Sequence, residues 1–451
     1  MITRRAATAG LATTLIGLSG RVSAPAQPTP QELAAGLGKG LTANLAARPA
    51  PQRLRPDAAK DTELWAFNGK LDEVTRLKHG QELAFNLKNE TPLPLSLHCH
   101  GVRGPNAMDG AGGLTQEPVA PGKEHEYRFI PPDSGTFLIR PCVIGGSAEP
   151  TERGLTRMLI VEEAAPPQVD QDIALLVDDW ALADDGSLAL TEPAPMGRLG
   201  SFLTLNGKPT SQRIKARPGG RIRLRLANAC NARNMRLRFD GLKAYVIAVD
   251  GQPSSTFEPL KATLPFAPGN RYDLLVDLPT ETGPAGMVMA MIGNGFPLVE
   301  IVAEGDKREA LPEIAPLPPN PRLPEMIKLQ NATRRDVVLK GDPQTNTPWA
   351  INGAAGSTSA SLVKVKRGTP VVLTLKNETG LLQPMHLHGH SFRLLHALDD
   401  GWEPYWLDTV QVPENKTIRI AFVADNPGKW LLASTVMERF DAGLWTWIEV
   451  T

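Results

Sequence analysis

Paired histidines on two short segments are the residues of this 451-residue chain whose types and spacing could do chemistry. The first segment reads LSLHCHG and holds His98 and His100, and the second reads PMHLHGH and holds His386 and His388. Because side chains alternate faces along a strand, the two histidines of each pair point the same way. Imidazole is a common ligand of copper and zinc. The two pairs therefore predict a metal site assembled from distant parts of the chain.

The elements that must position these histidines are β-strands. Apolar and polar residues alternate in RIRLRLAN (221–228), VVLTLKN (371–377) and TIRIAFVAD (417–425), and the chain contains 41 glycines and 41 prolines, which favour turns. This pattern predicts an all-β fold. The 48 basic and 48 acidic residues balance. Because no basic tract is present, nothing indicates nucleic-acid binding.

Proline-rich stretches divide the chain into blocks of the size of one Greek-key sandwich. We expect a signal peptide at 1–26 and a Pro/Ala-rich lead-in at 27–60, with a short helix at 30–41. The expected β domains then cover 61–165, 166–310 and 327–451, with a Pro-rich linker at 311–326 before the last of them. The first and last blocks repeat each other, since both contain LKNET shortly before the His-X-His-Gly segment.

The first 26 residues have the features of an export signal. Arg4 and Arg5 precede an apolar stretch that ends at Leu18, and Ala24-Pro25-Ala26 provides a small-residue cleavage site. The arginine pair favours the twin-arginine type, although Ala7 stands where that motif usually has a bulky apolar residue. The alternative is an uncleaved anchor. No later segment is expected to span a membrane, so we expect a periplasmic location.

Several longer motifs carry a family resemblance. They are HCHG (98–101), NAMDG (106–110), SGTF (134–137), PWAING (348–353), QPMHLHGHSF (383–392), LDTVQVP (407–413) and ADNPGKW (424–430). With these motifs the chain resembles the multicopper oxidases, the three-domain cupredoxin proteins that include laccases. The resemblance implies three cupredoxin-like Greek-key β-sandwich domains.

The resemblance also assigns copper-ligand positions, and this chain fills only some of them with ligands. His98 and His386 match type 2 copper ligands, and His100 and His388 match type 3 ligands. Two further histidine positions hold Arg140 and Cys142. At the type 1 copper, where the family has His, Cys, His and Met, the residues are Gln383, Ser434, Arg439 and Leu444.

These departures argue against the family reaction. A type 1 copper takes its redox character from a cysteine thiolate, and the last block contains no cysteine. We therefore expect no laccase-type activity and no full set of four coppers. His98, His100, His386 and His388, with Cys142, could still hold one copper ion. The alternative is a metal-free vestige in which the imidazoles form hydrogen bonds.

Two functions remain open at this stage. The first is a periplasmic, non-oxidase binding or scaffold protein with a partner in the cell envelope or division machinery, because the family includes a copper-free member that supports cell division. The second is a copper-binding or copper-handling oxidoreductase that uses the four-histidine site. Surface or structural roles are expected for His79, His125 and His396, and a structural role near the site is expected for His390. The resemblance gives Asp109 a counterpart near the oxygen-access region, and the alternative, a turn-making role beside Gly110, is the one we expect.

Overall fold

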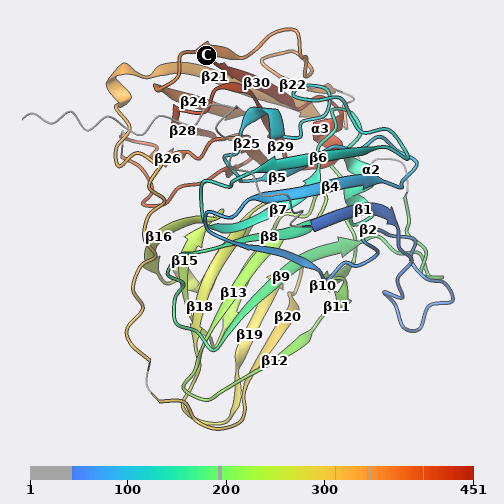
Figure 1. Cartoon of the computed structure of the whole chain (residues 1–451), viewed down its shortest axis with the longest axis vertical. Helices are drawn as coiled ribbons and strands as arrows, with labels where there is room; N and C mark the ends of the chain where they lie inside the picture. The colour runs from blue at the N-terminus through green and yellow to red at the C-terminus, as the bar shows by residue number, and fades with distance from the viewer. Residues whose placement is uncertain (1–42, 191–195, 310, 343, 346, 400) are drawn as a thin grey trace, which may run out of the picture. The chain divides into compact units, whose positions relative to one another are not determined.

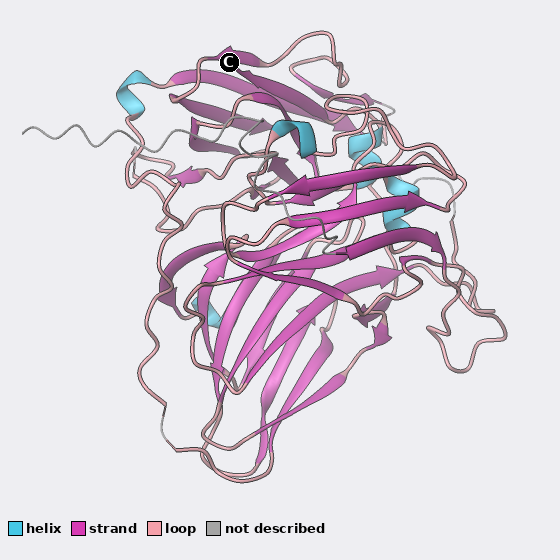
Figure 2. Ribbon diagram, viewed as in Figure 1, coloured by secondary structure: helices cyan, strands magenta, loops and turns pink. Residues whose placement is uncertain are grey.

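The structure is a computed structural model, and it describes residues 43–190, 196–309, 311–342, 344–345, 347–399 and 401–451. The expected signal peptide and the helix expected at 30–41 lie outside the described residues. Strands dominate what is described, and helices are short (Figure 2). The prediction of an all-β fold is confirmed. No helix among the described residues has the length and apolar character needed to cross a membrane.

Two four-stranded sheets are built from residues before 163 (Figure 1). In sheet order the strands are β2 (Trp65–Phe67), β1 (Ala43–Pro49), β4 (Leu83–Asn89) and β6 (Glu124–Phe129), then β3 (Val74–Lys78), β8 (Arg157–Glu162), β7 (Gly135–Pro141) and β5 (Leu97–His100). Strand β1 lies inside the segment 27–60 that we expected to be only a lead-in. That expectation is wrong for this part, because β1 pairs in parallel with β4 and Leu45 and Ala47 are fully buried.

The middle block forms sheets of seven and five strands. The first contains β11 (Lys208–Pro209), β10 (Phe202–Leu205), β9 (Gln171–Trp180), β13 (Arg221–Asn228), β18 (Arg271–Asp277), β15 (Lys243–Val249) and β16 (Gln252–Phe257). The second contains β12 (Gln212–Ala216), β20 (Phe296–Ala303), β19 (Gly283–Met291), β14 (Met235–Asp240) and β17 (Thr263–Phe266). The Pro-rich segment 311–326 that follows contains neither helix nor strand.

The last block forms two five-stranded sheets. They contain β22 (Thr347–Ile351), β21 (Thr333–Asp342), β24 (Thr369–Asn377), β28 (Thr417–Ala424) and β26 (Arg393–Leu395), then β23 (Val363–Val365), β30 (Trp445–Val450), β29 (Gly428–Ser434), β25 (Gln383–Leu387) and β27 (Thr409–Val412). The short helices are η1 (Asn106–Met108), α2 (Ala148–Glu152), η2 (Leu260–Ala262), η3 (Leu329–Asn331) and α3 (Met437–Asp441).

The repeated LKNET sequence makes the same turn before each histidine strand. Asn89 ends β4, and its side chain accepts hydrogen bonds from the backbone and hydroxyl of Thr91 while its amide donates to the carbonyl of Leu93. Asn377 ends β24 and makes the equivalent bonds to Thr379 and Leu381. An asparagine side chain that satisfies its own turn fixes the path of the chain. The two turns therefore deliver β5 and β25 in equivalent positions.

Candidate metal centre

The structure brings the four paired histidines together in one buried cluster. His98 and His100 come from β5, and His386 comes from β25 while His388 follows directly after it. The ring of His98 stacks on that of His388 with centroids 3.6 Å apart, and the ring of His100 stacks on that of His386 at 3.7 Å. The Nε2 atoms of His98 and His386 lie 3.2 Å apart. Each histidine of the first pair thus stacks on one histidine of the second pair.

The outer ring nitrogens of His98 and His386 bind backbone carbonyls. His98 Nδ1 lies 2.8 Å from the carbonyl oxygen of Asp109, and His386 Nδ1 lies 2.9 Å from that of Asp408. Because a carbonyl oxygen only accepts, both Nδ1 atoms must carry the proton. In neutral rings the lone pairs then sit on the two Nε2 atoms, which face each other. A metal ion or a shared proton between them would relieve the repulsion of these lone pairs.

The carboxylate of Asp109 orients a second imidazole. Its two oxygens lie 3.1 and 3.0 Å from His388 Nδ1, and one lies 3.3 Å from His98 Nδ1. Burial alone would raise the pKa of Asp109, but His388 and His98 outweigh it and hold that pKa below its usual value. Burial lowers the pKa of His388 to about 3, so this ring is neutral at pH 7. Asp109 also ends the turn at η1, as expected, because its backbone N–H donates to the carbonyl of Asn106, and its carboxylate adds a contact with His388 that the turn-making role did not include.

Asp408 supports the opposite side of the cluster. One of its oxygens lies 3.2 Å from His386 Nδ1 and 3.6 Å from His100 Nε2. Its carboxylate also accepts two hydrogen bonds from the guanidinium of Arg271, at 3.0 and 2.5 Å. Thr409 adds a hydroxyl 3.0 Å from His100 Nε2. Asp408 and Thr409 belong to the motif LDTVQVP, but no local pattern in the sequence indicates that they contact the histidines.

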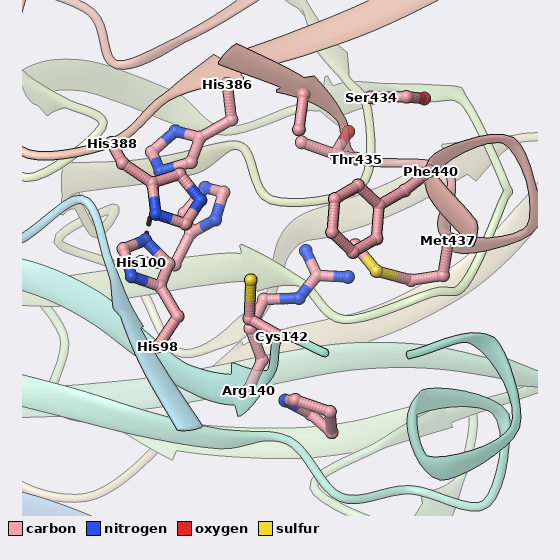
Figure 3. Close-up of a pocket in the computed structure, with 12 residues that line it drawn as sticks. His98, His100, Arg140, Cys142, His386, His388, Ser434, Thr435, Met437 and Phe440 are labelled. Carbon is pink, nitrogen blue, oxygen red and sulfur yellow. Dashed lines mark hydrogen bonds between the residues drawn. The ribbon is translucent and has the colours of Figure 1, made fainter. Parts of the chain in front are cut away.

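A cavity of about 30 Å³ lies beside the cluster, measured as the space open to the centre of a water-sized sphere. It is large enough for one or two small ions or water molecules. The four histidines line one side of it (Figure 3). Arg140 and Cys142 line another part of the wall, and the guanidinium of Arg140 extends toward Met437 and Phe440 in Figure 3. The pairing of β5 with β7 explains this position, since Arg140 lies directly opposite His98.

The imidazole cluster fits a single metal ion. Two nitrogens bound at about 2.0–2.1 Å to one tetrahedral ion lie roughly 3.3 Å apart, close to the 3.2 Å between the facing Nε2 atoms. Ligand atoms of His98, His386 and His388 all lie within 4.8 Å of one another, as do those of His100, His386 and Asp408. Histidine ligands commonly donate their other ring N–H to a carbonyl or carboxylate, and this arrangement is present here.

Cys142 lines the cavity but is less suited to be a ligand. Among the described residues it belongs to none of the groups whose ligand atoms lie within 4.8 Å of one another. Burial raises the pKa of its thiol, so the thiolate form that binds metals is disfavoured. Its role as a ligand stays a prediction.

The four residues that the resemblance places at the type 1 copper positions are all buried. The guanidinium of Arg439 donates to the side-chain oxygen of Gln383 at 2.8 Å and to the carbonyl of Leu382, also at 2.8 Å. The backbone N–H of Ser434 donates to the carbonyl of Leu444, and the backbone N–H of Leu444 donates to the carbonyl of Arg439. A positively charged guanidinium and an amide thus occupy this region, and none of the four residues offers an imidazole or a thiolate.

The other histidines have structural surroundings. His390 is buried, its Nδ1 lies 3.1 Å from the carbonyl oxygen of His388, and its ring packs on Phe422 and Trp430. His396 lies 3.3 Å from the carboxylate of Asp399, and that pair is exposed.

Comparisons with known proteins agree with this architecture. Models of the family described as multicopper oxidase match residues 50–166, 172–291 and 318–451. The structure of a multi-copper oxidase from Pseudomonas thermotolerans is similar with a TM-score of 0.81 and 30% identity, over 91% of this chain and 98% of that chain. The expectation of cupredoxin-like β-sandwich domains is thereby confirmed.

Two relatives carry different functional names. Multicopper oxidase MmcO of Mycobacterium tuberculosis is 28% identical over 450 residues, which cover 88% of this chain and 84% of that protein. Cell division protein FtsP of Proteus mirabilis is 25% identical over 430 residues, which cover 88% of this chain and 87% of that protein.

Proposed function

The chain belongs to the multicopper oxidase family, and on that premise we propose that it is a binding protein without oxidase activity that holds at most one metal ion. The observation that carries this proposal is the hydrogen bond between Arg439 and Gln383, at two positions where the family has imidazoles. A guanidinium keeps its charge and donates hydrogen bonds, so it repels a cation instead of binding it. With Ser434 in place of the thiolate, no soft ligand remains.

Loss of this electron-entry site removes the family reaction even if the four-histidine cluster binds copper. A bound copper ion would supply Lewis acidity and one-electron redox chemistry. The residues of this chain would orient that ion through His98 and His386, whose Nδ1 atoms are held by backbone carbonyls. The described residues offer no cysteine thiolate at the type 1 position to pass electrons to it.

Oxygen uptake by the copper-loaded, full-length protein tests the absence of oxidase activity. Phenolic compounds and cuprous ions serve as electron donors, and a His98→Ala/His386→Ala double variant serves as the matched control because it lacks the cluster. We expect the same slow uptake with both proteins, equal to that of free copper. Turnover by the wild type that the double variant lacks would contradict the proposal.

A second candidate function, copper handling, is supported by the two facing Nε2 atoms 3.2 Å apart. Two imidazoles whose Nδ1 atoms are bound to carbonyls and whose Nε2 atoms face each other favour an ion between them. Copper and zinc titration of the metal-free protein tests this function, with His396→Ala as the control that removes an exposed histidine. One ion per chain that is lost only in the His98→Ala/His386→Ala variant would support copper handling, and an absence of binding would leave the scaffold function.

We also propose export to the periplasm and a protein partner. The arginine pair near the N-terminus supports export through the twin-arginine route. The similarity to Cell division protein FtsP supports a partner in the cell envelope or the division machinery. Affinity purification of the full-length protein from cross-linked cells tests the partner, with a reporter fused to residues 1–30 as the test of export.

A further inference from the structure

Arg140 is a buried charged side chain without a partner. It is 2% exposed, and none of its three side-chain nitrogens has a hydrogen-bond partner among the described residues. Four other buried arginines are paired with carboxylates: Arg103 with Asp133, Arg223 and Arg225 with Asp273, and Arg271 with Asp408. Protein groups therefore satisfy those four guanidinium groups and leave that of Arg140 unsatisfied.

An unpaired buried charge is expensive, at several kcal/mol even after the protein relaxes. Arg140 cannot escape this cost by losing its proton. Burial lowers its pKa to about 10, which still leaves the side chain charged at neutral pH. Cys142 and Asp178 are the acidic groups nearest in effect, but burial raises the pKa of both and so favours their neutral forms, while the neighbouring Arg271 adds to the positive potential. A bound anion from solution would offset the cost of burying the unpaired guanidinium of Arg140.

The cavity beside Arg140 has the size and chemistry to take that charge. Thr435 lines the same cavity, and its buried hydroxyl also has no partner among the described residues. Met437 and Phe440 close the side away from the histidines with apolar atoms (Figure 3). The space open to the centre of a water-sized sphere is about 30 Å³, which suits one ion the size of chloride or nitrite better than a tetrahedral oxyanion such as sulfate.

We infer that this cavity binds one small monovalent inorganic anion, held by the guanidinium of Arg140 and the hydroxyl of Thr435. A single negative charge neutralises the single guanidinium in a water-poor site. The anion site does not require a metal ion, because it rests on the orphaned guanidinium and not on the imidazoles. It goes beyond the proposed function, since nothing in a scaffold or copper-handling role calls for an anion.

Titration of metal-free, full-length protein with sodium bromide and sodium nitrite tests this inference, with sodium gluconate holding the ionic strength constant. The melting temperature reports binding, and sodium sulfate is the size control. We expect bromide and nitrite to raise the melting temperature in a saturable way and sulfate to have no such effect. Equal effects of all salts, or none with any of them, would overturn the inference, because water would then suffice for Arg140.

Variants locate the site. Arg140→Gln should weaken bromide binding at least tenfold, and Thr435→Val should weaken it less. Arg335→Gln removes the exposed guanidinium of Arg335, with the same change of net charge, and should bind bromide like the wild type. Bromide affinity in Arg140→Gln equal to that of the wild type would contradict the assignment.

A crystal of the wild type soaked in bromide provides a measurement that does not depend on whether the variants fold. An anomalous peak within hydrogen-bond distance of Arg140 is expected, and its absence at saturating bromide would refute the site. Copper stoichiometry measured on the same samples keeps the two questions apart. Loss of copper binding with retained bromide binding would overturn only the metal proposal, and the reverse result would overturn only the anion site.

Discussion

Substitution of Asp109 by asparagine separates an orienting role in metal binding from a purely structural one. The carboxylate of Asp109 contacts His388 Nδ1 at 3.0 and 3.1 Å and His98 Nδ1 at 3.3 Å. Asp109→Asn keeps the size of the side chain but removes its charge. The amide also turns a donor toward at least one ring N–H. His388 therefore loses the acceptor of its Nδ1–H, whereas His98 Nδ1 keeps its bond to the backbone carbonyl of Asp109.

The expected effect on metal affinity follows from the number of contacts. Loss of such a supporting acceptor typically weakens metal binding about 10–100-fold, equivalent to roughly 1.4–2.7 kcal/mol. Because His98 keeps its bond to the backbone carbonyl of Asp109, the substitution removes the acceptor of one imidazole only, and we expect the lower half of that range. Calorimetric titration of the metal-free protein with Cu(II) and Zn(II) measures the change, and circular dichroism verifies that the variant is folded.

The exposed pair of His396 and Asp399 provides a matched control for this substitution. Its ring nitrogen and carboxylate oxygen lie 3.3 Å apart, the same distance as in the pair of His98 and Asp109. Asp399→Asn makes the same chemical change away from the cluster and should leave metal affinity unchanged. If Asp109→Asn bound Cu(II) as tightly as the wild type, the imidazoles that it orients would not be the ligands, and the reasoning would be refuted.

Three further predictions concern stability, measured as the urea-unfolding free energy of the metal-free protein. Gly110→Ala should destabilise by more than about 2 kcal/mol, because Gly110 has φ +77° and an added Cβ would lie 1.8 Å from the carbonyl oxygen of Leu97; an unchanged midpoint would contradict this. Asp408→Asn should cost roughly 3–5 kcal/mol by breaking the buried pair with Arg271, whereas a loss below about 1 kcal/mol would show that the pair contributes little. Burial raises the pKa of Glu152 from 4.5 to about 8. Between these two pH values the folded state holds a proton that the unfolded chain has released. The free energy of unfolding should therefore fall as pH rises from 4.5 to about 8. Glu152→Gln should flatten that dependence, and an identical slope in the variant would assign it to other groups.

The fold could be predicted from the sequence because its signals are local and repeated. Alternating strands indicate sheets, and the two LKNET segments indicate duplicated turns, which the structure shows as the same hydrogen bonds at Asn89 and Asn377. The convergence of the two histidine pairs followed from the same repeat. Strand β1 was missed because ANLAARP is rich in alanine and has no strict alternation, and its place depends on parallel pairing with β4.

The supporting residues of the cluster could not be predicted from spacing alone. Asp109 lies beside a glycine and is plausible as a turn residue, and only the tertiary fold brings its carboxylate to His388, 279 positions away. The same holds for the bond from Arg439 to Gln383 across 56 positions and for the missing partner of Arg140. These features depend on which side chains meet in space, for which the sequence carries no local signal.

The absorption spectrum of the purified protein after loading with copper tests the central claim most directly, together with the copper content per chain. We expect at most one copper ion per chain and no intense blue band, because none of Gln383, Ser434, Arg439 and Leu444 carries a thiol. An intense blue band, or about four coppers per chain together with oxygen reduction, would contradict it.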